Sequence, residues 1–137
     1  MASFQLELVS PEKLLLSRAV EMVIIPAAEG EMGVLPGHAP MIVTLRGGTI
    51  RVTEGGKETD RLFVAGGFAE VTPDRVTILA DEATPVAELS KAEAERRVLE
   101  AETNYGLIAA GDPPEKREAA MAMLLAMRAM RESAEAA

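Results

Sequence analysis

Apolar residues alternate with polar ones through most of the first 84 residues, which is the pattern of β-strands with one buried face. Phe4, Leu6 and Leu8 show this alternation at the start, and short runs of the same kind follow. The apolar positions of those runs are Val20, Met22, Ile24, Ile50, Val52, Leu62, Val64, Val76 and Ile78. Turn-prone segments such as 54–57 and 72–74 separate the runs at intervals of roughly 8–12 residues. This pattern predicts a β-sandwich or barrel.

Downstream of residue 85 the chain becomes rich in alanine, glutamate and arginine, and its apolar residues recur with the period of a helix. Ser90 and Glu93 have the spacing of a capping box. In that motif the serine hydroxyl accepts a hydrogen bond from an early backbone amide, while the glutamate reaches back to the cap. The apolar stripe of this first predicted helix consists of Ala94, Val98, Ala101 and Tyr105.

A loop with Gly106 and Gly111 interrupts the helical pattern, and a second helix follows. Asp112 is expected to cap it, with Pro113 in the first turn, where a missing N–H costs nothing. The second helix is expected to run to about Arg131, and the alanine-rich tail after residue 133 is expected to fray.

The sequence therefore predicts two domains, a β domain over residues 1–86 and an antiparallel two-helix hairpin over residues 87–137. Helices of this length are marginal in water unless an apolar face is covered. The hairpin is either a mobile appendage or a fixed part of the fold, and the pattern allows both. Its methionines suit either an adaptable binding strip or an ordinary seam between the helices. They are Met121, Met123, Met127 and Met130.

Composition narrows the possible functions of the 137-residue chain. Its net charge of −8 argues against binding to nucleic acid or to an anionic membrane. It has no cysteine, which excludes disulfides and thiolate chemistry, and one histidine, His38, which cannot form a histidine-rich metal site. The N-terminal segment does not resemble a secretory signal. We therefore expect a cytoplasmic protein that needs no metal or cofactor and acts by docking onto other proteins.

Residues 26–40 form the most distinctive segment, with three glycines and three prolines. This composition predicts a stiff, irregular loop that presents groups to a partner, with Glu29, Glu31 and His38 as the contact patch. The alternative is a crossover turn whose acidic side chains are merely solvated. A catalytic use of these groups lacks support, because no nucleophile or metal accompanies His38 and nothing buries the two glutamates. We expect no catalytic residue.

Two glycine pairs have simpler interpretations. Gly66 and Gly67 lack both the Lys-Ser/Thr ending of a phosphate-binding loop and a helix after it, so they predict a bulge or a close approach of strands. Gly47 and Gly48, after Arg46, are interpreted as the corner of a hairpin.

Three stretches together resemble the epsilon subunit of bacterial F-type ATP synthase: EGEMGVLPGHAP at 29–40, FVAGGFAEV at 63–71 and VTILAD at 76–81. With the helical hairpin, the resemblance covers nearly the whole chain in order. It implies a ten-stranded β-sandwich followed by two helices. It also implies a non-catalytic rotor subunit at the foot of the central stalk, on the cytoplasmic face of the bacterial inner membrane. There it would touch the gamma subunit and the c ring, through the loop with Glu31 and His38, and the membrane only indirectly.

The resemblance also implies a regulatory hairpin, which in many members extends and restrains ATP hydrolysis. Basic residues of the last helix are then expected to contact beta subunits, and Arg128 and Arg131 are the candidates here. Some members bind ATP through a Leu/Ile-Asp-x-x-Arg-Ala motif. Ser90 and Glu93 occupy its Asp and Arg positions in this chain, and Glu93 replaces a phosphate-pairing cation with an anion. We expect no nucleotide at this degenerate motif. The alternative function is an ATP-sensing module whose hairpin closes on the nucleotide.

Overall fold

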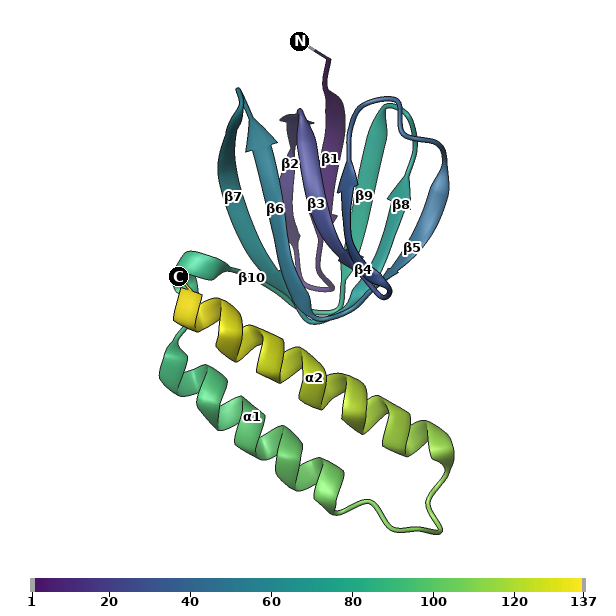
Figure 1. Cartoon of the computed structure of the whole chain (residues 1–137), viewed down its shortest axis with the longest axis vertical. Helices are drawn as coiled ribbons and strands as arrows, with labels where there is room; N and C mark the ends of the chain where they lie inside the picture. The colour runs from purple at the N-terminus through teal and green to yellow at the C-terminus, as the bar shows by residue number, and fades with distance from the viewer. Residues whose placement is uncertain (1, 137) are drawn as a thin grey trace.

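In residues 2–136, which the computed structural model describes, ten β-strands are followed by two α-helices (Figure 1). The strands are β1 (Phe4–Val9), β2 (Leu14–Val20), β3 (Met22–Ala27), β4 (Gly30–Val34), β5 (Met41–Leu45), β6 (Gly48–Glu54), β7 (Lys57–Val64), β8 (Gly67–Val71), β9 (Arg75–Ala80) and β10 (Ala83–Pro85). The helices are α1 (Lys91–Gly106) and α2 (Pro114–Ala136), and a short 3-10 helix, η1 (Val86–Glu88), precedes α1.

The strands form two facing layers (Figure 1). One layer has the order β10-β7-β6-β3-β4 and the other β5-β8-β9-β1-β2. The layers join where Ala27 of β3 pairs with Leu45 of β5. Among the described strands, neighbours pair antiparallel except β1 and β9, which are parallel. The predicted ten-stranded β-sandwich followed by a two-helix hairpin is confirmed.

Aliphatic side chains from both layers fill the sandwich. Phe4, Leu6 and Leu8 of β1 are at most 3% exposed, as the alternation predicted. The predicted inward positions of β6, β7 and β9 are buried as well: Ile50, Val52, Leu62, Val64, Val76 and Ile78. The buried face of each of these strands could therefore be assigned from hydrophobic alternation alone.

One predicted strand is out of phase. The prediction placed Val20, Met22 and Ile24 on one buried face, whereas the structure buries Val23 and Ile25 and leaves Met22 and Ile24 half-buried. The chain bends at Glu21, between β2 and β3, so the alternation restarts one residue later. A break of one residue moves every later side chain to the opposite face.

Gly67 lies where β8 and β9 approach each other very closely. A Cβ atom on it would lie 2.1 Å from the carbonyl oxygen of Leu79 and 3.0 Å from Cα of Ala80. The φ angle of Gly67 is +133°, a conformation that other residues rarely adopt. The predicted close approach of strands at this pair of glycines is therefore confirmed.

The segment around Arg46 is not a hairpin corner, contrary to the prediction. The strands on either side of it, β5 and β6, are separated by β3 in the strand order. The backbone amide of Arg46 donates instead to the carbonyl oxygen of Pro26 at 2.9 Å. The glycines that follow let the chain cross from one layer to the other.

The start of α1 follows the predicted cap in part. The Ser90 hydroxyl accepts a hydrogen bond from the Glu93 amide at 3.2 Å. The Glu93 carboxylate does not reach back to the cap as predicted, because it accepts hydrogen bonds from the Arg96 guanidinium one turn further along. The stripe Ala94, Val98 and Ala101 is buried as predicted, with Tyr105 half-buried.

The second helix differs from its prediction at both ends. It begins at Pro114, and the Asp112 carboxylate accepts a hydrogen bond from the Ala109 amide at 2.8 Å, inside the loop, instead of capping the helix. The helix continues to Ala136, so residues 134–136, where fraying was predicted, are helical; residue 137 of the predicted tail lies outside the described residues. Ala134 is only 3% exposed because it packs in the core of the hairpin.

The hairpin lies across one end of the sandwich, with α2 nearer to the strands than α1 (Figure 1). Phe63, on the outer side of β7, is fully buried among residues of both helices. The hydroxyls of Thr49 and Ser133 form a hydrogen bond of 2.8 Å between β6 and α2. Of the two possibilities that the sequence allowed, the structure therefore shows the docked hairpin.

An ion pair between Glu82 and Arg97 joins the sandwich to α1, and it makes the stability pH-dependent. Hydrogen bonds from Arg97 hold the pKa of the Glu82 carboxyl below its usual 4.5. Stability from this pair is therefore present above about pH 4.5 and is lost as the pH falls through the lowered pKa. We expect the stability difference between the parent and Glu82→Gln, from urea unfolding at pH 7, to shrink at about pH 3. A difference that stays constant with pH would contradict this.

Candidate functional site

The three residues of the predicted contact patch do not come together. Glu29 lies in the β3–β4 turn and Glu31 on β4, at the end of the sandwich near the helices, whereas His38 lies in the β4–β5 loop at the opposite end (Figure 1). Glu31 pairs with Arg51 at 3.2 Å, and Nδ1 of His38 lies 2.8 Å from the carbonyl oxygen of Ala39. The predicted single loop over residues 26–40 is wrong, because β4 occupies its middle.

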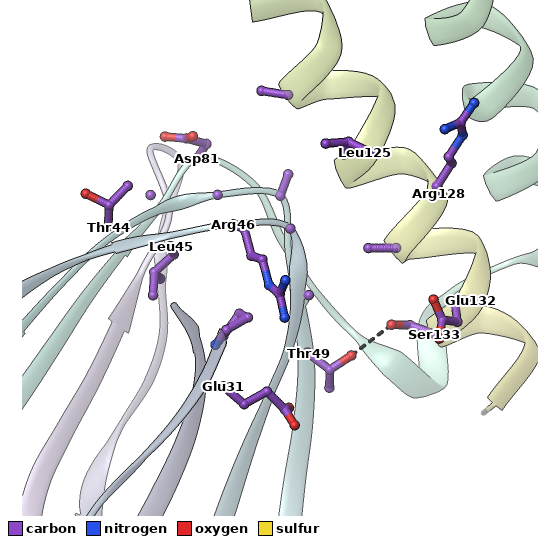
Figure 2. A pocket seen from close by; sticks show the side chains of 18 of the residues that line it. Glu31, Thr44, Leu45, Arg46, Thr49, Asp81, Leu125, Arg128, Glu132 and Ser133 are labelled. Carbon is purple, nitrogen blue, oxygen red and sulfur yellow. Dashed lines mark hydrogen bonds between the residues drawn. The ribbon is translucent and has the colours of Figure 1, made fainter. Parts of the chain in front are cut away.

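The residues proposed for regulation lie on the hairpin. Arg128 and Arg131 of α2 lie 3.8 and 3.7 Å from Glu102 and Glu95 of α1. Figure 2 shows the Arg128 side chain directed away from the sandwich. In the docked state both arginines are therefore paired with carboxylates of α1. These exposed pairs are long, and such pairs contribute little to stability.

The degenerate nucleotide motif at the start of α1 has the carboxylate of Glu93 at its arginine position. Hydrogen bonds from Arg96 lower the pKa of the Glu93 carboxyl, which is therefore ionised at neutral pH. The Ser90 hydroxyl is engaged by the Glu93 amide. An anionic ligand would meet a carboxylate where the motif requires a guanidinium.

The described residues do not form a metal site or a membrane-spanning helix. Within residues 2–136, histidine, aspartate and glutamate side chains do not form a group of three that could hold a metal ion. Neither of the two described α-helices combines the length and the apolar character that a membrane span requires.

The outer face of the second layer carries an apolar row that the sequence did not predict. Phe68 of β8 pairs with Leu79 of β9, Leu79 pairs with Val9 of β1, and Val9 pairs with Leu14 of β2. Ile42 lies on β5 two residues from Thr44, which is the partner of Phe68. We call Ile42, Phe68, Leu79, Val9 and Leu14 the apolar row.

Four of the five members of the apolar row are large and exposed, and Val9 is half-buried. Ile42 is 74% exposed, and Phe68, Leu79 and Leu14 are 54–56% exposed. Neighbouring exposed apolar side chains on one face typically mark a surface that another protein covers. A signal was present in the sequence, because Phe68 and Leu79 occupy outward positions of strands whose inward positions are also apolar.

Beside Phe68, an open groove of about 980 Å³ separates the end of the sandwich from α2. Its walls include Phe68 and Arg46 on the sandwich and Leu125 and Ser133 on α2. Figure 2 shows that the Thr49–Ser133 hydrogen bond crosses the groove at one end. One side of α2 therefore borders an open groove, while another side packs against Phe63 of the sandwich.

These features define a class of protein, a β-sandwich with an appended helical hairpin and one exposed apolar face. A family model described as "ATP synthase, Delta/Epsilon chain, beta-sandwich domain" matches residues 3–86. The chain belongs to this ATP synthase delta/epsilon family.

Individual relatives agree with this assignment. The chain is 61% identical to the ATP synthase epsilon chain of Granulibacter bethesdensis over 134 residues, which is 98% of each chain. It is 52% identical to that of Rhodospirillum rubrum over 122 residues, 89% of this chain and 90% of the relative.

Solved structures share the fold. A chain in the cryo-EM structure of the Euglena gracilis mitochondrial ATP synthase, with OSCP, F1 and c-ring, superposes with a TM-score of 0.76 at 27% identity. The match covers 97% of this chain and 82% of that one. A chain in the central stalk and c-ring structure from Tetrahymena thermophila has the same fold, with a TM-score of 0.70 at 15% identity over 96% of both chains.

Proposed function

We propose that the chain is a non-catalytic central-stalk subunit of an F-type ATP synthase, which links the gamma subunit to the c ring and so couples proton transport to ATP synthesis. It would sit at the cytoplasmic face of the bacterial inner membrane as a peripheral subunit. The names of the relatives and the F1 and c-ring assembly of the Euglena neighbour support this proposal.

The observation that carries the proposal is the apolar row. A large exposed apolar face is unfavourable in a free protein, and covering it stabilises a complex. The gamma subunit is the partner that we propose for this face, because a stalk must transmit torque through a firm contact. Glu31 and His38 lie at opposite ends of the sandwich, so we propose that they contact different partners, one in the c ring and one in gamma.

Crosslinking tests this proposal, because the chain has no cysteine and each introduced one is unique. In working membranes, cysteines at Ile42 and Phe68 should crosslink to gamma, and those at Glu31 and His38 to different polypeptides. Lys57, the exposed first residue of β7 next to the β6–β7 turn, is the control and should give no stalk product. Recovery of a free monomer, with no crosslink at any position, would remove the proposal.

We further propose that the hairpin restrains ATP hydrolysis through Arg128 and Arg131. Both arginines would have to leave Glu102 and Glu95 to reach acidic groups on a beta subunit. We expect Arg128→Gln with Arg131→Gln to raise ATP hydrolysis in membranes by about threefold while synthesis is retained, since each lost charge pair shifts such an equilibrium modestly. Lys116→Gln with Arg117→Gln is the matched control, and an equal rise in both double variants would contradict the assignment.

A further inference from the structure

The helix α2 comes closest to the sandwich at Gly47, in the segment between β5 and β6. A Cβ atom on Gly47 would lie 2.6 Å from Cα and 2.8 Å from Cβ of Ala126. The φ angle of Gly47 is not positive, so its backbone would accept other residues. Space alone therefore requires glycine here.

The second contact lies about two helical turns further along α2. There the Ser133 hydroxyl meets the Thr49 hydroxyl of β6 at 2.8 Å. Between and beside these contacts, small α2 residues such as Ala122 and Ala129 border the open groove. The position of α2 over the segment 47–49 is thus defined by two short contacts, in addition to the packing of Phe63 in the hairpin core.

Docking of the hairpin determines whether Phe63 is buried. Phe63 is fully buried, yet it projects from the outer side of β7 and belongs to the apolar cluster of the hairpin, not to that of the sandwich. Release of the hairpin would expose this ring, whereas the sandwich core would remain intact. The docked and released states would then differ in the interface between the hairpin and the sandwich. Packed interfaces of this kind switch between discrete arrangements.

We infer that Gly47 and Ala126 form a steric latch: α2 docks only while residue 47 has no side chain and residue 126 has nothing larger than a methyl group. Any larger group at either position forces α2 away from β6. The hydroxyls of Thr49 and Ser133 are then pulled apart, because Ser133 lies on the same helix as Ala126. This inference concerns the isolated chain and does not depend on the proposed function.

Disulfide formation between cysteines at Thr49 and Ser133 reports docking, since the parent chain has no other cysteine. In the full chain with Thr49→Cys and Ser133→Cys, a limiting oxidant should close the disulfide rapidly. Adding Gly47→Ala should slow closure by about tenfold or more, because an inserted methyl group cannot be accommodated without shifting the helix. Adding Ala126→Leu tests the same contact from the helix side and should give a similar slowing.

The controls are Gly111→Ala, at a glycine with nothing within 4 Å, and Ala119→Leu, at an exposed position of α2. Both should close the disulfide at the parent rate. Circular dichroism of each variant shows whether the strands are retained, and if Gly47→Ala loses them, Ala126→Leu decides. Slowing in a folded latch variant supports the latch. Closure at the parent rate in folded Gly47→Ala and Ala126→Leu would overturn it.

Discussion

Replacing Gly67 with alanine is expected to destabilise the sandwich by about 4 kcal/mol or more, or to prevent folding. The added Cβ would lie 2.1 Å from the carbonyl oxygen of Leu79, and backbone atoms cannot move aside as a flexible side chain can. Relief of the clash would require β8 and β9 to separate. Because β9 also pairs with β1, the disturbance would spread through the second layer.

The matched control for this substitution is Gly30→Ala. Gly30 has a φ of +142°, close to the +133° of Gly67, but nothing lies within 4 Å of its Cβ position. It therefore reports backbone strain without a clash, at about 1–3 kcal/mol. Urea unfolding followed by circular dichroism measures both variants. Equal losses would mean that backbone conformation, and not the contact with Leu79, explains the need for glycine at position 67.

Replacing Phe63 with alanine is expected to cost about 3–5 kcal/mol, the range for removing a buried aromatic side chain. Phe63 is the part of the sandwich that completes the apolar core of the hairpin. Most of the stability of helices in proteins comes from the packing of an apolar face. We therefore expect the loss to fall on the hairpin, with fast hydrogen exchange in α1 and α2 and an unchanged exchange rate in the sandwich core.

Phe68→Ala is the control for size and residue type. Phe68 lies on the same sandwich but is 55% exposed, so its loss should change the stability of the isolated chain by less than about 1 kcal/mol. Phe63→Ala should therefore lower the stability of the isolated chain, whereas Phe68→Ala should weaken the contact with gamma, because Phe68 belongs to the face proposed for gamma. Slow exchange in the helices of Phe63→Ala would show that the hairpin holds together without this ring.

The burial of Phe63 and the exposure of Phe68 could not be predicted from the sequence. Both lie at outward positions of strands whose inward residues are buried. Neither the periodicity nor the composition tells which of the two a helix covers. That distinction depends on the hairpin lying across β7 and not across β8. The same holds for His38, which is close in the chain to Glu29 and Glu31 but lies beyond the other end of β4.

The wrong phase predicted for Met22 and Ile24 also arose from a feature that the linear pattern does not show. The segment from Val20 to Ile25 is apolar except for Glu21 and spans the end of β2 and the start of β3, and periodicity alone does not mark the bend between them. The end of α2 was missed because Ala134 is held by packing in the hairpin core, which outweighs the tendency of a terminal alanine-rich segment to fray.

The sequence by itself determined the two halves of this protein, the buried faces of most strands, the close approach at Gly67 and the serine cap of α1. These features rest on local rules: alternation, glycine geometry and capping act between residues that are near in the chain. Only the tertiary structure decided which apolar residues stay exposed, that α2 meets Gly47, and that the predicted contact residues lie at opposite ends. Those features depend on which distant segments come together, and a linear pattern of apolar and polar residues does not encode that pairing.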